Sequence, residues 1–269
     1  MKKRKKAKVK KNNIRVIIIS IILLLIVSLL CAGYYSYKEY HKTNIPSVDK
    51  LIHEKKKNNY EEPVSEKENV EEEKAPYVNQ LPSYRQQYGN NNIMGRLEIP
   101  NLNINSLVTR TDNNSYYLTY NIYNQNDGLG VPFFDYRNID LMNDKQVNIY
   151  GHNTQNEKYF DVLPFINLEA YIDVNIFNNY KDVYLSIDEE QRKYEVVAIK
   201  IITGDDNTHM RIRFQNDEDF IEHTNRLISG SLYQRENLKI SKEDQILVLQ
   251  VCHYNPPNTY LLVICKKQT

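Results

Sequence analysis

A cysteine and a histidine stand side by side near the end of this 269-residue chain, as Cys252 and His253 in VCHYNPPNTYLLVICKK. A thiolate is a strong nucleophile, and it forms most readily beside a base or an ion-pair partner. However, QILVLQVCH alternates as a strand does, and adjacent side chains of a strand point to opposite faces. His253 is therefore expected to turn away from Cys252, so the partner must come from elsewhere in the chain.

His152 is the better candidate for that partner. The stretch VNIYGHNT predicts a strand that ends in Gly-His-Asn, which would present an imidazole at a strand end. Two other histidines fit the role less well, because we expect His209 on the surface of a polar loop and His223 on the solvated side of a helix. The sequence thus favours Cys252 and His152 as a nucleophile and its acid/base partner, with no cofactor and no metal.

Strands must position both residues. Short apolar runs separated by Asn, Asp, Gly and Pro clusters are typical of an all-β barrel or sandwich. A few peripheral helices interrupt them, at LPSYRQQYG, near NEKYFDVLPFI and at NDEDFIEHTNRLIS, where Asn216 or Asp217 can cap. The predicted strands are MGRLEIP, INSLVT, GVPFF, QVNIYGH, DVYLSI, KYEVVAIKII, QILVLQVCH and YLLVICK.

Three segments precede this domain, which we place at residues 77–269. Residues 1–15 are strongly basic, and residues 16–37 carry no charge and are long enough to cross a bilayer as one helix. Residues 38–76 are rich in Lys and Glu and predict a solvated stalk. By the positive-inside rule the N-terminus is cytoplasmic and the domain extracellular. A cleaved secretory signal is the alternative to this transmembrane signal anchor.

Charge and cysteine content narrow the function further. The net charge of +1 does not suggest a nucleic-acid binder. The domain holds two cysteines, Cys252 and Cys265, which is too few for a disulfide scaffold and fits either one bridge or a free thiol. Cys265 is expected to be a small buried hydrophobe on the face opposite to Tyr260, five residues before it.

Four stretches stand in order along about residues 78–269: MGRLEIPNLNINSLV, GLGVPFFDYRN, NIYGHNT and DQILVLQVC. Through these stretches the chain resembles the sortases, and class B most closely. The helix DEDFIEHTNRLI also stands where class B members insert one.

The resemblance implies a cell-surface cysteine transpeptidase. Such an enzyme cleaves a C-terminal sorting motif of secreted proteins through a thioester and joins them to a peptidoglycan-precursor or pilin amine. The resemblance also implies that Cys252 is the nucleophile and that His152 protonates the leaving amine.

The third residue of the site departs from the family. Sortases place an arginine at the start of the last strand, facing the cysteine, and Tyr260 takes that place here. A tyrosine hydroxyl can donate one hydrogen bond but lacks the charge of a guanidinium. Arg211 or Arg213 could supply a substitute cation, and we prefer them to Arg137 because the inserted helix follows them. The nearby NPPNT is interpreted as a turn.

Two alternatives stay open. One keeps the fold and weakens or removes the chemistry, giving a sortase-like binding protein, and the missing arginine favours it. The other is a different exported cysteine hydrolase, such as a cell-wall peptidase. Those enzymes usually place the cysteine at a helix N-terminus, whereas ILVLQVC predicts a strand.

Overall fold

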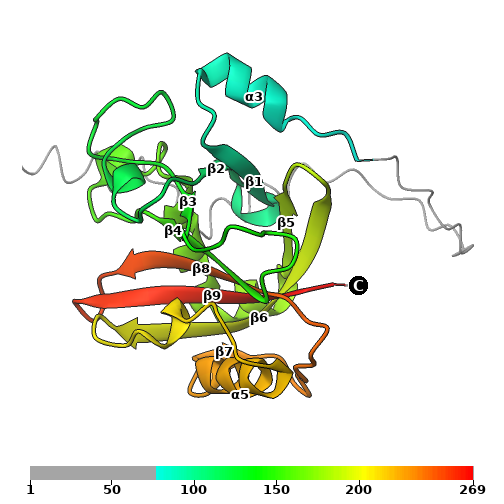
Figure 1. Cartoon of the computed structure of the whole chain (residues 1–269). Helices are drawn as coiled ribbons and strands as arrows, with labels where there is room; N and C mark the ends of the chain where they lie inside the picture. Colours follow the sequence, from blue (N-terminus) through cyan, green and yellow to red (C-terminus); the bar gives the residue numbers. More distant parts are fainter. Residues whose placement is uncertain (1–76, 269) are drawn as a thin grey trace, which may run out of the picture. The chain divides into compact units, whose positions relative to one another are not determined.

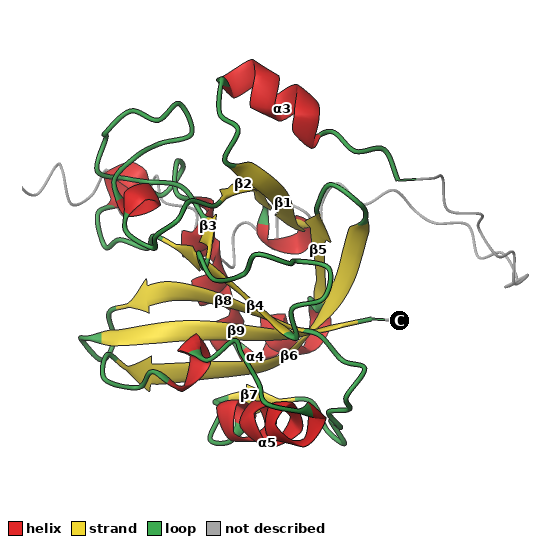
Figure 2. Ribbon diagram, in the orientation of Figure 1, coloured by secondary structure: helices red, strands yellow, loops and turns green. Residues whose placement is uncertain are grey.

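The computed structural model describes residues 77–268, in which eight strands close into a barrel (Figures 1 and 2). The order around the barrel is β5-β1-β2-β3-β4-β8-β9-β6, and pairing of β5 with β6 closes it, while β7 adds to the outer edge of β6. The predicted all-β barrel is confirmed. The strands are β1 (Ile93–Ile99), β2 (Ile104–Thr109), β3 (Phe133–Phe134), β4 (Gln146–Gly151), β5 (Asp182–Ser186), β6 (Gln191–Thr203), β7 (Tyr233–Gln234), β8 (Ile246–His253) and β9 (Thr259–Lys267).

The central strands of this barrel are apolar on both faces. In β8 every residue from Ile246 to Leu249 is buried, and in β9 the buried run extends from Leu261 to Cys265. Strands covered on both sides lose their simple alternation, which explains the continuous apolar runs in the sequence. β4 runs parallel to β8, so the two strands end at the same edge of the sheet.

The helices follow the sequence in part. α3 (Leu81–Tyr88) ends at Gly89, whose φ of 59° is left-handed, and the side chain of Asn216 caps α5 (Asp217–Ile228) as predicted. The stretch NEKYFDVLPFI forms 3-10 turns rather than an α-helix. The remaining helical elements are α4 (Val174–Asn179) and the 3-10 turns η1 (Pro100–Leu102), η2 (Tyr116–Leu118), η3 (Glu157–Tyr159), η4 (Pro164–Ile172) and η5 (Thr208–Met210).

α5 covers part of the outer face of the barrel. Its Phe220 and Leu227 pack against Val248 of β8 and Leu262 of β9. The expectation that His223 is solvated is wrong, because only 2% of it is exposed. Positions three and four apart share a helix face, so His223 lies on the same face as Phe220 and Leu227 and is carried into the interface.

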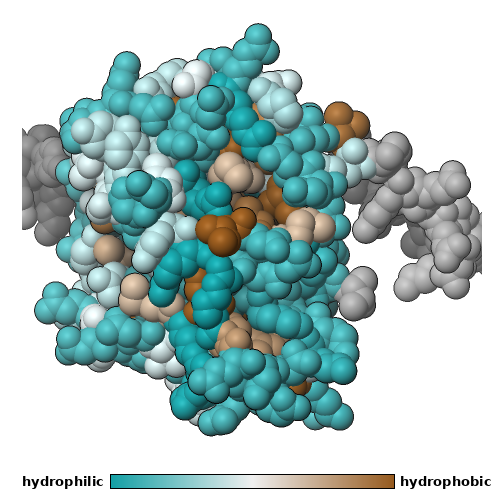
Figure 3. Space-filling model, viewed as in Figure 1, coloured by the Kyte–Doolittle hydropathy of each residue, from teal (hydrophilic) through white to brown (hydrophobic). Residues whose placement is uncertain are grey.

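The described residues contain no helix that is both long and apolar enough to cross a membrane. The predicted transmembrane segment at 16–37 lies outside the described residues, as do the basic tail and the stalk. The face of the domain in Figure 3 is largely hydrophilic, with apolar residues scattered between polar ones. Such a surface is typical of a domain exposed to water.

Candidate active site

Cys252 lies near the end of β8 on the same face as Val248 and Gln250. Burial alternates over the last residues of the strand: Val251 and His253 are buried, and Cys252 is only partly buried. The thiol therefore points to the outer face, beyond the part that α5 covers. His253 points to the other face, as the alternation predicted.

His152 follows directly after β4, one residue beyond the last pair of β4 with β8. The parallel register pairs Gly151 with Val251, so the next residue along each strand is His152 and Cys252. Paired strands are about 4.8 Å apart, and residues in register on parallel strands point to the same face. The two side chains are thus brought to one edge of the sheet.

The backbone carbonyl of Leu118 in η2 fixes the His152 ring. His152 Nε2 lies 2.6 Å from the Leu118 carbonyl oxygen. A carbonyl can only accept, so Nε2 must carry the proton that is donated. This leaves Nδ1 as the ring nitrogen that can exchange a proton with the thiol or with a leaving group.

Gly151 is required by close packing immediately before His152. A Cβ atom at this position would lie 2.3 Å from Cδ1 of Phe165, a buried residue of η4. No side chain fits at that distance, so glycine allows β4 to run directly against η4. The Gly-His pair of the sequence therefore reflects a contact with another element rather than a turn.

Tyr260 of β9 is the cross-strand partner of Cys252. Directly opposite residues of an antiparallel pair point to the same face, so the tyrosine lies beside the thiol. Its ring also packs against the apolar cluster under α5. Tyr260 thus occupies the position that the resemblance assigned to an arginine, and its phenol is the group presented there.

The three arginines considered as substitutes are each paired with a carboxylate. Arg137 Nη2 lies 2.7 Å from Asp135 Oδ2, Arg211 pairs with Asp219 in the first turn of α5, and Arg213 pairs with Asp144. The hydrogen bonds and ion pairs of these arginines within residues 77–268 do not reach Cys252 or Tyr260. Asp144 precedes β4, at the opposite end of the strand from His152, so Arg213 is held roughly 25 Å of strand length away.

The segment Asp-Tyr-Arg-Asn, residues 135–138, forms hydrogen bonds with residues of β4. Asp135 is fully buried and accepts a hydrogen bond from the Tyr150 hydroxyl at 2.8 Å. It also accepts hydrogen bonds from the Arg137 guanidinium. Burial acts to raise the pKa of Asp135, but hydrogen bonds from Arg137 and Tyr150 outweigh it and lower that pKa. Arg137 therefore stabilises the buried Asp135 carboxylate, which accepts a hydrogen bond from Tyr150, two residues before His152.

The electrostatic surroundings of Cys252 hold the thiol in its neutral form. Burial raises the pKa of Cys252, and no basic group among the described residues offsets this effect. The thiol also makes no hydrogen bond with another side chain in the described part of the chain. The surroundings of Cys252 thus favour the neutral thiol over the thiolate in the free protein.

Two sequence expectations about nearby residues can be settled. Cys265 is fully buried and both cysteines are free, which confirms the buried-hydrophobe interpretation and excludes a bridge between them. The expectation that His209 is a surface residue is wrong, because it is 3% exposed. The loop carrying it folds over β4, where the His209 carbonyl accepts hydrogen bonds from Gln146 and Asn148. Burial lowers the pKa of His209.

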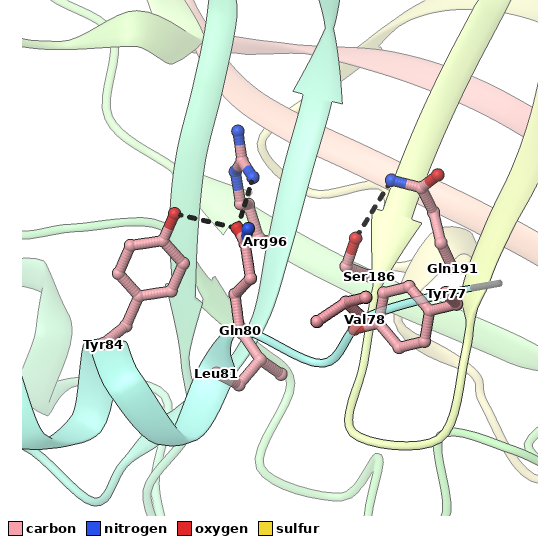
Figure 4. A pocket seen from close by; sticks show the side chains of 8 residues that line it. All are labelled: Tyr77, Val78, Gln80, Leu81, Tyr84, Arg96, Ser186 and Gln191. Carbon is pink, nitrogen blue, oxygen red and sulfur yellow. Dashed lines mark hydrogen bonds between the residues drawn. The ribbon is translucent and has the colours of Figure 1, made fainter. Parts of the chain in front are cut away.

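Several pockets lie on the surface formed by residues 77–268. A shallow one of about 400 Å³ adjoins the strand ends and includes Asn153, Glu169 and Tyr254. A second, of about 330 Å³, lies beneath α3, where Figure 4 shows Arg96 and Tyr84 directed toward Gln80. The second pocket lies on the β1 and β5 side, across the barrel from β4 and β8, and is not part of the candidate site.

Within residues 77–268 no cluster of His, Cys, Asp or Glu is arranged to hold a metal ion.

Three functional residues escaped the sequence analysis: Leu118, Gly151 and Glu169. Leu118 acts through its backbone carbonyl, which no side-chain pattern reveals. Gly151 was noticed only as part of the strand end that carries His152. Glu169 lies in η4, and it meets the site through contacts between segments more than 80 residues apart in the sequence.

Solved structures of sortases share this barrel. The sortase B of Clostridium perfringens matches with a TM-score of 0.64 at 24% identity, covering 70% of this chain and 99% of that one. The sortase B of Listeria monocytogenes matches with a TM-score of 0.60 at 25% identity, covering 70% and 99%. The fold and the paired strand ends thus define a sortase-type barrel with a cysteine and a histidine at one edge.

Curated relatives agree with this class. The sortase B of Listeria monocytogenes is 29% identical over 164 residues, or 61% of this chain, and the chain spans 63% of that protein. The sortase B of Staphylococcus aureus is 24% identical over 183 residues, 66% of this chain and 70% of that protein. No family model matches the chain. The relatives and the solved structures together support the sortase family, class B-like, as the group that this chain resembles.

Proposed function

We propose that this protein is a cell-surface cysteine transpeptidase. It cleaves a sorting motif near the C-terminus of secreted proteins and joins them to an amine of a peptidoglycan precursor or a pilin. The observation that carries the proposal is the parallel register of β4 and β8, which brings His152 beside Cys252. Relatives support the choice of substrates: the S. aureus sortase B was solved with a substrate, and another sortase B with triglycine.

The chemistry uses two covalent steps. In the first step Cys252 Sγ attacks the peptide carbonyl carbon and its proton passes to His152. The C–N bond then breaks as the imidazolium returns that proton to the leaving amine, and a thioester remains. In the second step the acceptor amine attacks the thioester carbon and passes a proton to His152. The C–S bond then breaks, and the imidazolium returns that proton to the leaving thiolate of Cys252. No redox partner is needed, and every bond broken is balanced by one formed.

Tyr260 is proposed to stabilise the oxyanion of both steps. Its position opposite Cys252 suits a donor aimed at the reacting carbonyl, and the phenol can donate one hydrogen bond. A neutral donor supplies less stabilisation than a guanidinium, so we expect a slow enzyme. Arg211 and Arg213 stay alternatives for this role, although each is bound to a carboxylate in the free protein.

The proposal extends to location. Residues 16–37 would anchor the protein in the cell membrane with a cytoplasmic N-terminus, and the barrel would lie outside the cell, where secreted substrates and wall precursors are found. The uncharged length of residues 16–37 and the basic block before it support this arrangement.

A sortase-like binding protein without transpeptidation is the competing function. The raised pKa of Cys252 and the carboxylate partners of the arginines favour it. A transfer assay separates the two. A panel of sorting peptides is incubated with the protein and triglycine, and ligated product is detected by mass. Ligation by the unaltered chain and by Cys265→Ala, but not by Cys252→Ala, supports the enzyme; peptide binding without ligation supports the binding protein.

A further inference from the structure

The residues that directly follow His152 and Cys252 converge on one carboxylate. Asn153 Nδ2 donates to Glu169 Oε1 at 2.9 Å and also to the Cys252 carbonyl oxygen at 2.8 Å. His253 Nδ1 lies 2.9 Å and 3.0 Å from the two oxygens of Glu169. Glu169 therefore contacts the segment carrying the histidine and the segment carrying the nucleophile.

These contacts continue where the backbone ladder stops. The paired register of β4 and β8 ends at Gly151 and Val251, one residue short of the reacting side chains. Beyond that point the two chains are joined by the bond from Asn153 to the Cys252 carbonyl, and by the Tyr254 hydroxyl, which donates to the Asn153 carbonyl at 2.8 Å. Side-chain hydrogen bonds thus set the separation of His152 from Cys252.

The His253 ring is held by acceptors at both of its nitrogens. Nδ1 of His253 faces the Glu169 carboxylate, and Nε2 faces the backbone carbonyl of Asn255. His253 is 6% exposed and Glu169 29% exposed. Hydrogen bonds to an ionised carboxylate are stronger than those to a neutral amide, so replacing the Glu169 carboxylate would weaken its hold on Asn153 and His253.

We infer that Glu169 is a positioning residue, which holds Asn153 and His253 in place and thereby sets the geometry between the His152 imidazole and the Cys252 thiol. The inference rests on the proposed function for its effect on rate. The coupling of the two strand ends through Glu169 is a separate claim that does not need activity.

The test is Glu169→Gln in the full chain, which keeps the shape of the side chain and removes its charge. Single-turnover formation of a thioester with a sorting peptide is measured at several peptide concentrations. We expect the rate at saturation to fall about 10- to 100-fold, as for a small misplacement of reacting groups, while the half-saturating concentration stays within about twofold. Hydrogen exchange should quicken in peptides covering residues 150–154 and 250–255.

Two further variants separate positioning from a general loss of structure. Glu98→Gln removes a carboxylate of similar exposure, 22%, which pairs with Arg96 on β1; it should leave the acylation rate and the exchange of both peptides unchanged. Asn153→Ala acts through the same carboxylate, so the double variant with Glu169→Gln should be little slower than the slower single variant.

The outcomes distinguish this inference from the proposed function. An unaltered chain that forms no thioester with any peptide contradicts the proposed function, and the exchange measurement still decides the coupling through Glu169. Unchanged exchange at both strand ends in Glu169→Gln overturns the inference. Faster hydrogen exchange in Glu169→Gln with an unchanged acylation rate would mean that Glu169 does not position the His152 imidazole relative to the Cys252 thiol. Fully additive losses of acylation rate in the double variant would mean the same.

Discussion

In the proposed mechanism, Cys252 is a neutral thiol in the free protein and is activated within the complex with substrate. Burial raises its pKa, and no cation among the described residues lowers it in the free protein. Activation therefore falls to His152, whose Nδ1 is left free by the bond from Nε2 to Leu118. This arrangement predicts general-base activation rather than a preformed thiolate–imidazolium pair.

The pH dependence of alkylation tests that expectation. The thiolate is the reactive form, and a raised pKa means that less of it exists at neutral pH than for an ordinary thiol. The rate of Cys252 alkylation by iodoacetamide should therefore keep rising with pH and level off above the point where free cysteine does. The modified residue is identified by mass. A plateau already reached below about pH 7 would indicate a preformed ion pair instead.

In the proposed mechanism, the level of activity depends on the hydroxyl group of Tyr260. Tyr260→Phe removes only the hydroxyl and should cost about 1–3 kcal/mol in transition-state stabilisation, the scale of one hydrogen bond in a desolvated site. Arg213→Ala should be mild, because its partner Asp144 precedes the far end of β4. The acylation rates of Tyr260→Phe, Arg211→Ala and Arg213→Ala, each compared with the unaltered chain, show whether Tyr260 or an arginine stabilises the transition state. A mild Tyr260→Phe with a severe Arg211→Ala or Arg213→Ala would assign the role to an arginine.

Single residues were predictable where strand alternation alone decides orientation. The opposite directions of Cys252 and His253, and of Tyr260 and Cys265, follow from the sequence and hold in the structure. The burial of His209 and His223 could not be predicted from their own loop and helix, because other elements cover them. The ion pairs of Arg211 and Arg213 likewise depend on contacts that a lone sequence does not show.

At the scale of elements, the end of β4 is positioned by η4. Phe165 occupies the space that a side chain at Gly151 would need, and Glu169 of the same 3-10 turn reaches the residues after both strand ends. η4 therefore contacts both strand ends of the candidate site, through Phe165 at Gly151 and through Glu169 at Asn153 and His253. The sequence predicted helix near this stretch but not its 3-10 form or its contacts.

Gly151→Ala tests the packing of β4 on η4. The added methyl group should push the strand end away from Phe165, lowering the free energy of unfolding by about 1–3 kcal/mol and slowing acylation. Phe165→Leu makes room, so the double variant should regain part of both losses, and Phe165→Leu alone is the matched control. Urea unfolding and acylation rates give the answer. Full activity and stability in Gly151→Ala would mean that the contact with Phe165 does not position His152.

For the whole molecule, the barrel was predictable and its placement in the cell stays a proposal. Apolar runs, turn residues, Gly89 and the Asn216 cap were enough to predict the strands, α3 and α5. The barrel order brings together strands far apart in the sequence, such as β4 and β8. The sequence analysis did not predict that pairing, and the resemblance to sortases only assigned Cys252 and His152 to one site.

Topology can be tested on intact cells stripped of their wall. If residues 16–37 span the membrane with the basic block inside, protease added outside should remove the domain and spare the cytoplasmic tail. An epitope at each terminus reports the two sides, and a cytoplasmic protein serves as the control for lysis. Survival of the C-terminal epitope in unlysed protoplasts would contradict an extracellular barrel.

The most direct test of the account is the mass of the intact protein after a single turnover with sorting peptides. We predict a covalent acyl adduct on Cys252 that is released by hydroxylamine, is absent from Cys252→Ala, is strongly reduced in His152→Ala and persists in Cys265→Ala and His253→Ala. An adduct that requires His253 but not His152, or identical blank spectra for the unaltered chain and Cys252→Ala across a broad peptide panel, would contradict it.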